Sequence, residues 1–347
     1  MHSHAQNEYR EMPLFGVIDD TTDPIAMSTA KEKMCTGLKK DTTDAIPPRK
    51  LHSFIDLFAG VGGFHLAASR NGLRCVFASE IDNAACEVYA ANFGIIPHGD
   101  IADIDAKNIP DHDLLCAGFP CQPFSIIGNR GGFDDTRGTL FFEIARILSE
   151  KRPTAFILEN VRQLMTAGGG HVMRRILDTL EELGYKTDYR VLNALDYGLP
   201  QLRKRILIVG RLDTLNHFKW PAPVGKRISL AQILEKNPDR RHFVSERIAR
   251  ARHAAHRSDI RPSIWHENKG GNIASHPYSC ALRAGASYNY LLVNGERRLT
   301  PREMFRLQGF PDDFNLHEKI SQCRKQAGNA VPVPMIEATI KGLLDLG

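Results

Sequence analysis

The sequence contains no apolar run that approaches the roughly 18 uninterrupted residues of a membrane span. Its N-terminus lacks the charged-then-apolar layout of a secretory signal. Its seven cysteines are irregularly spaced and include no CxxC pair, which argues against a disulfide framework and a structural zinc site. Internal repeats and low-complexity tracts are also absent. These absences predict a soluble cytoplasmic protein without a metal, and the length of 347 residues is typical of about two domains.

The net charge of +5 is concentrated in one part of the chain. Residues 211–290 contain 14 Lys and Arg against 6 Asp and Glu, whereas the rest of the chain contains 31 against 34. The same segment carries six histidines. A charge run can be just a solvated face, but a segment that holds the whole positive surplus indicates a polyanionic partner such as nucleic acid.

Strands and helices are expected to alternate between residues 53 and 210. Compact apolar runs predict strands, and longer periodic stretches between them predict helices. The expected strands lie at 53–58, 74–79, 112–117, 154–158 and 205–210, and the expected helices at 64–70, 83–91, 139–150 and 171–183. This alternation is typical of βαβ units, so we expect an α/β fold with a doubly wound, mostly parallel, Rossmann-like sheet.

The rest of the chain divides around this core. Residues 1–49 show no sustained periodicity, which predicts a flexible tail or linker. The alternation fails after Gly210, and a capping box in Leu299-Thr300-Pro301-Arg302-Glu303 indicates that the α/β pattern resumes. The expected domains are therefore an α/β domain at 50–210 that continues at 296–347, and a second, smaller domain at 211–295.

Cys121 lies between two prolines in Gly118-Phe119-Pro120-Cys121-Gln122-Pro123-Phe124-Ser125. The preceding apolar run predicts a buried strand, so Cys121 is expected at the strand's end, where open α/β sheets place their active sites. Proline fixes φ and restricts the residue before it, which stiffens the backbone on both sides of the sulfur. Most free cysteines are small buried residues. A core cysteine needs no such bracket, so Cys121 is predicted to be a nucleophile.

A glycine-rich turn, Asp56-Leu57-Phe58-Ala59-Gly60-Val61-Gly62-Gly63, joins the first expected strand to a helix. Glycines allow a ligand to approach the backbone, and a helix N-terminus offers free N–H groups. Glu80 ends the second strand 20 residues beyond Gly60, where an acid binds ribose hydroxyls. Asp100, in Gly99-Asp100-Ile101, is expected to follow the third strand, where a carboxylate can accept from an adenine amino group. Surface acids are common and the turn departs from GxGxxG, but together these features predict an adenosine-type ligand.

Three further charged residues are candidates for the reaction. Glu159 follows an apolar strand, which suits it to proton donation beside a nucleophilic cysteine, although it can also simply cap a helix. Arg203 and Arg205 share one face of an extended segment by the period of two, and can serve an anion or a carbonyl oxygen or be ordinary strand-edge residues. From the residues alone, the role of the turn Gly328-Asn329-Ala330-Val331-Pro332-Val333-Pro334 stays open.

In their order and spacing, these motifs closely resemble those of the DNA (cytosine-5) methyltransferase family, of the bacterial restriction–modification type. The resemblance runs from residue 54 to residue 335 and leaves out only the N-terminal tail and 211–290. The matching motifs are DLFAGVGGFHLA, the acid of ASEID, GDI, GFPCQPFS, GTLFFEIARIL, ENV, QLRKR, LTPREMFRLQGFP and GNAVPVP. The resemblance implies an S-adenosylmethionine-dependent methyltransferase fold. In this fold, 211–295 is the target-recognition domain, and the α/β domain is catalytic and binds the cofactor.

The same resemblance implies methylation of C5 of a specific cytosine in duplex DNA. S-Adenosyl-L-methionine would be the cofactor and S-adenosylhomocysteine the product, with no metal. The base would be flipped out of the duplex, and Cys121 would attack C6. Glu159 looks like the group that protonates or hydrogen-bonds N3, Arg205 like the arginine that holds O2, and Arg203 like a residue that steadies the catalytic loop. The implied partners are double-stranded DNA and a restriction endonuclease of the same specificity, and the implied oligomeric state is a monomer.

The resemblance also names contact residues. Those expected at the cofactor are Phe58, Ala59, Gly60, Gly62, Gly63, Glu80, Ile81, Asp100, Ile101, Leu140, Asn329 and Val331. Ile81 stands where many relatives carry an aromatic residue, so aliphatic packing is expected against the adenine. Those expected at the DNA are Gln122, Ser125, Arg130, Arg250 and Arg283. The glycine-rich stretch Gly128-Asn129-Arg130-Gly131-Gly132 is expected to close over the DNA as a lid.

Three other functions remain to be weighed. An RNA cytosine methyltransferase can share the PCQ and ENV elements, although the basic segment favours DNA. A catalytically silent DNA-binding regulator conflicts with the intact set of Cys121, Glu159 and Arg205. An NAD-binding oxidoreductase would explain the glycine turn but not a cysteine held between two prolines.

Overall fold

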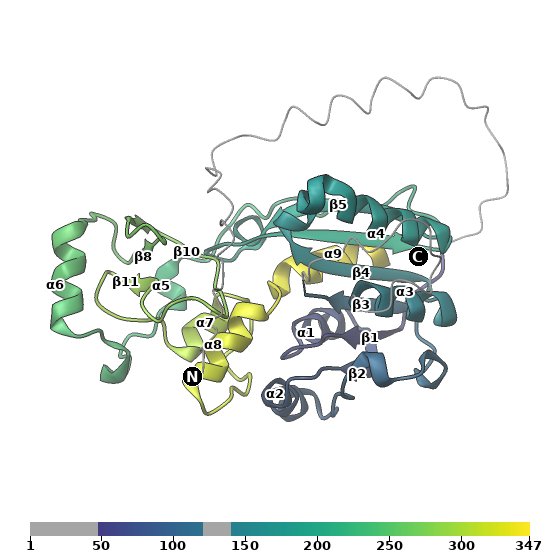
Figure 1. Ribbon diagram of the computed structural model, residues 1–347, viewed down its shortest axis with the longest axis horizontal. Coiled ribbons are helices and arrows are strands. Elements are labelled where there is room, and N and C mark those ends of the chain that lie inside the picture. Colours follow the sequence, from purple (N-terminus) through teal and green to yellow (C-terminus); the bar gives the residue numbers. More distant parts are fainter. Residues whose placement is uncertain (1–47, 121–139) are drawn as a thin grey trace, which may run out of the picture. The chain divides into compact units, whose positions relative to one another are not determined.

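A six-stranded sheet, in the order β2-β1-β3-β4-β7-β5, organises the computed structural model (Figure 1), which describes residues 48–120 and 140–347. The strands are β1 (Ser53–Leu57), β2 (Arg74–Ser79), β3 (Leu114–Gly118), β4 (Ala155–Val161), β5 (Lys186–Asn193) and β7 (Lys204–Arg211). Strands β2, β1, β3 and β4 pair in parallel, whereas β7 pairs antiparallel with both of its neighbours. The expected α/β class with a mostly parallel sheet is confirmed.

Helices cover both faces of this sheet because alternate side chains of each strand point to opposite faces. On one face, Phe54 and Cys116 belong to the same buried cluster as residues of α1 (Gly63–Arg70) and α9 (Val333–Leu344). On the other face, Ile55 and Leu115 pack with α3 (Leu140–Lys151) and α4 (His171–Glu182). The sheet is therefore doubly wound, and each strand and helix that was expected between residues 53 and 210 begins and ends within three residues of its expected bounds.

The reversed strand β7 has a simple cause. Only residues 194–203 connect it to β5, and such a short connection joins neighbouring strands as an antiparallel pair. Strand β5 itself was missed in the sequence. It lies at the edge of the sheet, and its side chains at Lys186, Asp188, Tyr189 and Arg190 are exposed, so it lacks the apolar run that predicts a buried strand.

Residues 211–295 contain short elements of their own. Two helices, α5 (Leu230–Ile233) and α6 (Glu246–Ala255), accompany an antiparallel sheet of β8 (Ile264–Glu267), β9 (Ile273–His276) and β11 (Leu291–Val293). A further strand, β10 (Ser279–Cys280), pairs with β6 (Gln201–Leu202) of the α/β region. In the view of Figure 1, this small sheet lies to the left and the six-stranded sheet to the right.

The chain returns to the main sheet through α7 (Pro301–Arg306), α8 (Ile320–Asn329) and α9. The expected capping box is present: the Glu303 N–H donates to the Thr300 hydroxyl, and the Glu303 carboxylate accepts from the Thr300 N–H. The helix α2 (Asn83–Phe93) follows β2 in the chain and is capped by Asp82. Within the described residues, no helix has the length and apolar character required to cross a bilayer.

Candidate active site

A cavity of about 660 Å³ lies at the carboxyl ends of β1, β2, β3 and β4. Its walls come from the residues that follow each strand, such as Phe58 after β1, Glu80 after β2 and Phe119 after β3. Open α/β sheets bind ligands at this position, where the strand order reverses between β1 and β3. The volume is within the range of about 300–1,000 Å³ that is usual for small-molecule sites.

The glycine-rich turn forms one wall of the cavity. Phe58, Gly60 and Gly62 all have positive φ values, of 54°, 55° and 85°. A Cβ atom on Gly60 would meet nothing within 4 Å, so this side of the turn is open. A Cβ atom on Gly62 would lie 2.2 Å from the Phe93 ring, and one on Gly63 would lie 2.7 Å from Val331 Cγ2. The glycines therefore allow both the tight turn and its close packing against neighbouring elements.

Glu80 is held rigidly at the edge of this turn. Its Oε2 accepts from the Gly60 N–H at 2.7 Å, and its Oε1 accepts from the Asp82 N–H at 2.8 Å. Ile81, between the two acids, is 71% exposed and lines the cavity, so an apolar face is available beside the carboxylate. Asp100 also lines the cavity, and its Oδ1 accepts from the Ala102 N–H, which fixes that acid at the start of the 3-10 turn Ile101–Asp103.

The residues expected at the cofactor are brought together here from distant parts of the chain. Those that line the cavity are Phe58, Ala59, Gly60, Gly63, Glu80, Ile81, Asp100, Ile101, Leu140, Asn329 and Val331. Gly62 is the exception, since it faces Phe93 and supports the turn from behind.

Glu159 and Arg205 form an ion pair in the same cavity. Glu159 lies in β4 and Arg205 near the start of β7, and the antiparallel pairing of these strands brings the two side chains together. Arg205 Nε donates to Glu159 Oε1 at 2.8 Å, and only 8% of the Glu159 surface is exposed. A hydrogen-bonded carboxylate and guanidinium beside a cavity can recognise a planar polar group, because each presents directional hydrogen-bonding atoms.

Arg203 is buried behind this pair, with 1% of its surface exposed. Its guanidinium donates to the carbonyl oxygens of Leu282 at 2.9 Å, Gly328 at 2.9 Å and Ala330 at 2.8 Å. Burial, assisted by the nearby charge of Arg205, lowers the pKa of Arg203 to about 9. These three bonds join the 211–295 region to the Gly328–Val331 turn, a connection that the spacing of QLRKR does not reveal.

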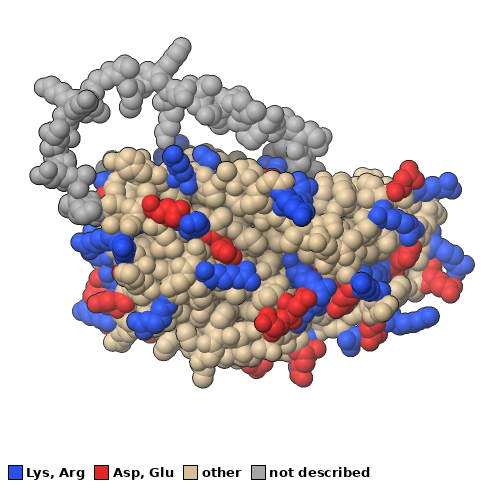
Figure 2. Space-filling view, turned by 180° about the vertical axis from the view of Figure 1, so that it is seen from behind, with Lys and Arg blue, Asp and Glu red and all other residues tan. Residues whose placement is uncertain are grey.

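Several expected site residues lie outside the described part of the chain. These are Cys121, Gln122, Ser125 and Arg130, together with the expected lid at 128–132. The residue before the cysteine, Pro120, lines the cavity. Of the two basic residues expected at the DNA in 211–290, Arg283 lines the cavity, whereas Arg250 is exposed on α6 away from it. On the face drawn in Figure 2, basic and acidic side chains are interspersed.

Other residues of the site were not singled out from the sequence. Asn160 Nδ2 donates to the Phe119 carbonyl at 2.9 Å and so holds the backbone just before Pro120; its place in ENV was the available signal. On α8, Lys325 pairs with Asp82, and Gln326 Nε2 donates to the Ala84 carbonyl at 2.9 Å. No local pattern marks these two residues, because their partners are more than 240 positions away. Within 48–120 and 140–347, no group of three or more His, Cys, Asp and Glu is arranged to hold a metal ion.

Comparisons with known proteins agree with this geometry. The family model of C-5 cytosine-specific DNA methylases matches residues 52–345. The chain is 55% identical to the Type II methyltransferase M.NgoBI of Neisseria gonorrhoeae, over 84% of this chain and 92% of that protein. It is 52% identical to the Type II methyltransferase M.HaeII of Haemophilus aegyptius, over 85% and 94%.

A solved structure supports the same fold. A variant of DNMT2 from Spodoptera frugiperda superposes with a TM-score of 0.67 at 22% identity, covering 84% of this chain and 99% of that one. The family match extends over nearly the whole described region and decides against an oxidoreductase. The chain therefore belongs to the C-5 cytosine-specific DNA methylases and is a DNA (cytosine-5) methyltransferase.

Proposed function

We propose that this protein methylates C5 of a specific cytosine in duplex DNA with S-adenosylmethionine, as the modification enzyme of a Type II restriction–modification system. One observation carries the proposal: a single cavity joins the Glu80-supported glycine turn to the Glu159–Arg205 pair. The similarity to M.NgoBI and M.HaeII, both Type II methyltransferases, supports the restriction–modification setting. In this proposal the enzyme acts as a monomer in the bacterial cytoplasm, alongside an endonuclease of the same specificity.

The cavity residues fit an S-adenosyl compound. The fixed carboxylate of Glu80 suits two ribose hydroxyls, and the exposed side chain of Ile81 suits an adenine face. Asp100 can accept from the adenine amino group, and the open side of Gly60 lets a ligand approach the backbone. When bound, S-adenosylmethionine supplies an electrophilic methyl group and leaves as S-adenosylhomocysteine.

The chain's own residues activate the base. C5 of cytosine is a poor nucleophile, and the target base must first leave the duplex stack, which costs a few kcal/mol. The Cys121 thiolate adds to C6, which makes C5 enamine-like. Arg205 turns from Glu159 to the O2 atom of the base, and Glu159, which takes up a proton once this ion pair opens, delivers a proton or hydrogen bond to N3. C5 then takes up the methyl group as the sulfonium C–S bond breaks, and loss of the C5 proton to a base breaks the Cys121–C6 bond and restores the aromatic ring.

The ion pair between Glu159 and Arg205 prepares both groups for this exchange. Because each satisfies the other before the base arrives, neither is left buried without a partner. Asn160 acts as a positioning residue, since its bond to the Phe119 carbonyl restrains the chain immediately before Pro120 and Cys121.

A covalent trap tests the proposal. Duplex DNA with 5-fluorocytosine at the target should form a stable adduct at Cys121, because fluorine cannot leave as a proton does. The target sequence comes from bisulfite sequencing of DNA from a host that expresses the protein. The variant Cys121→Ala should form no adduct and lose methyl transfer, whereas Cys75→Ala, at a cysteine outside the cavity, should retain both. Methyl transfer by Cys121→Ala above about one percent of the wild-type rate would remove Cys121 from its role. Methylation of tRNA but not of duplex DNA would overturn the choice of substrate.

A further inference from the structure

The end of α8 lies in direct contact with the segment Leu282–Ser287, which we call the 282–287 segment. A Cβ atom on Gly328 would lie 2.3 Å from the Ala284 nitrogen and 2.7 Å from the Arg283 carbonyl carbon. Both neighbours are backbone atoms, so only a glycine permits this approach. The expected DNA-reading segment and the expected cofactor turn, Gly328–Val331, therefore touch backbone to backbone.

Arg203 joins the 282–287 segment to the Gly328–Val331 turn through hydrogen bonds. One guanidinium nitrogen donates to the Leu282 carbonyl, and another donates to the carbonyls of Gly328 and Ala330. Bonds from a charged donor are stronger than neutral ones, and the side chain is almost completely buried. A shift of the 282–287 segment is thus transmitted to the Gly328–Val331 turn through one rigid group.

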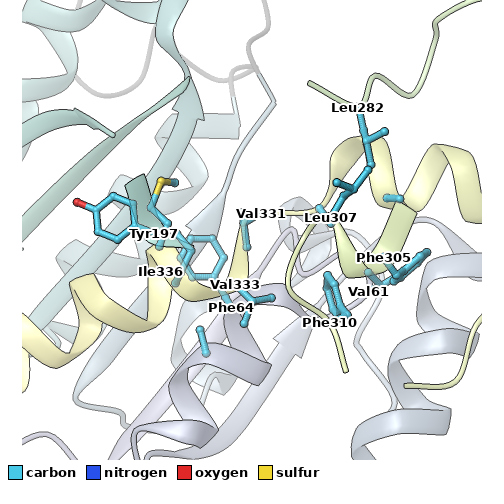
Figure 3. Close-up of a cluster of buried hydrophobic side chains, with 14 of the residues drawn as sticks. Val61, Phe64, Tyr197, Leu282, Phe305, Leu307, Phe310, Val331, Val333 and Ile336 are labelled. Carbon is cyan, nitrogen blue, oxygen red and sulfur yellow. The ribbon is translucent and has the colours of Figure 1, made fainter. Parts of the chain in front are cut away.

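The Gly328–Val331 turn continues this contact into the cofactor wall. Val331 packs closely against Gly63, because a Cβ atom on Gly63 would lie only 2.7 Å from Val331 Cγ2. The turn therefore packs against the start of α1. Leu282, Val331 and Phe64 belong to the same cluster of buried side chains (Figure 3). Asn329 and Val331 both line the cavity.

A second series of contacts, made by side chains of α8, links the 282–287 segment to the cofactor wall. Arg324 donates to the carbonyls of Ala286 and Ser287, at 3.3 and 3.2 Å. The next residue, Lys325, pairs with Asp82, whose backbone N–H donates to Glu80. The helix therefore connects the 282–287 segment to the carboxylate expected to bind ribose.

We propose that Arg203 and Gly328 couple the reading of the DNA sequence to the affinity for the cofactor. On the correct sequence, contacts with the 282–287 segment favour one position of the Gly328–Val331 turn, so cofactor and cognate DNA bind more tightly together than apart. A duplex without the site makes no such contacts and leaves the cofactor affinity unchanged. A ligand shifts an equilibrium only through a difference in its affinity for the two states, and the effect is reciprocal. This inference rests on the proposed function and describes the regulation of that same site.

Calorimetry on the full-length protein tests the coupling without any need for turnover. The dissociation constant of S-adenosylhomocysteine is measured for the protein alone, with a duplex that carries the methylated sequence, and with a scrambled duplex. In the wild type, the cognate duplex should tighten binding by about 5- to 150-fold, the usual range for allosteric coupling, and the scrambled duplex should not. In Arg203→Lys and Gly328→Ala, the ratio of the dissociation constant without DNA to the dissociation constant with the cognate duplex should fall toward one. A variant that changes the cofactor affinity equally with and without the duplex leaves this ratio unchanged.

Two further variants sharpen the test. Arg324→Ala removes the bonds to Ala286 and Ser287 and the contact of the guanidinium with the Tyr288 ring, at a partly exposed site, and should lower the ratio without a risk to folding. Arg211→Lys is the matched control, since Arg211, at the end of β7, is as buried as Arg203 and also donates to carbonyl oxygens, but pairs with Asp213 away from the cavity. Its ratio should equal that of the wild type. An unchanged ratio in the three test variants, or a wild-type ratio of one, would overturn the coupling, whereas absence of DNA methylation by the wild type would instead overturn the proposed function.

Discussion

Replacement of Glu80 should weaken cofactor binding far more than it slows the chemical step. The Glu80 carboxylate already accepts one backbone N–H on each oxygen, at 2.7 and 2.8 Å, so its orientation is set before any ligand arrives. Each oxygen keeps a lone pair for one ribose hydroxyl. A hydrogen bond to a charged group contributes about 1.5–3 kcal/mol. We use the lower value, because each oxygen is shared with an N–H donor.

Two such bonds amount to about 3 kcal/mol, which corresponds to a rise in the KM for S-adenosylmethionine of about 150-fold in Glu80→Ala. Glu80→Gln retains one acceptor oxygen and should raise KM by about tenfold, for a loss of about 1.5 kcal/mol. The value of kcat should change little, because ribose contacts stabilise the ground state and the transition state alike.

Steady-state methyl transfer at varied cofactor concentration, with saturating duplex, separates the two parameters. Asp105→Ala is the control: Asp105 also accepts a backbone N–H, from Lys107, but lies outside the cavity, so its KM should match the wild type. A collapse of kcat at unchanged KM in Glu80→Ala would refute the assignment, since the carboxylate would then be acting on the reaction itself.

Three further predictions concern the reaction, stability and specificity. Glu159→Gln should lower kcat by about 10²–10⁴-fold with little change in the cofactor KM, and an unaltered kcat in rapid-quench assays would exclude proton transfer by this group. Burial lowers the pKa of His65 from 6.5 to about 4, so its stabilising contribution is present above pH 6.5 and lost as the pH falls toward 4. Urea unfolding should show wild type losing about 3 kcal/mol relative to His65→Phe between pH 7 and pH 4, and parallel pH profiles would contradict this. Arg283→Ala should relax or shift the methylated sequence, whereas Arg250→Ala should weaken binding to all DNA; bisulfite profiling at two salt concentrations would count against this division if both variants behaved alike.

Local pattern was sufficient for much of the fold. The apolar strand at Ser53–Leu57, the glycine turn after it and the capping box at Thr300 and Glu303 depend on residues a few positions apart, so their structure follows from their own spacing. Glu80 could be assigned to the cofactor site because parallel strands end at the same edge of a sheet.

Edge position and chain reversal were harder to predict. Strand β5 has several exposed polar side chains because only one of its edges is paired, so periodicity did not mark it. The direction of β7 depends on the short connection before it, and that direction is what places Arg205 against Glu159. The sequence placed the two charges in one site, but their ion pair is a consequence of strand pairing.

By itself, then, the sequence determined most of the elements, the motif set and the family to which the motifs belong. The tertiary structure alone decided which of these residues bond to one another. Arg203 reaches Leu282, 79 positions away, and Gly328, 125 positions away, because three separate segments pack around one buried guanidinium. Gly62 needs to be a glycine because the Phe93 ring occupies the place of its side chain. Contacts of this kind depend on where distant segments meet after the core has packed, and no local spacing encodes them.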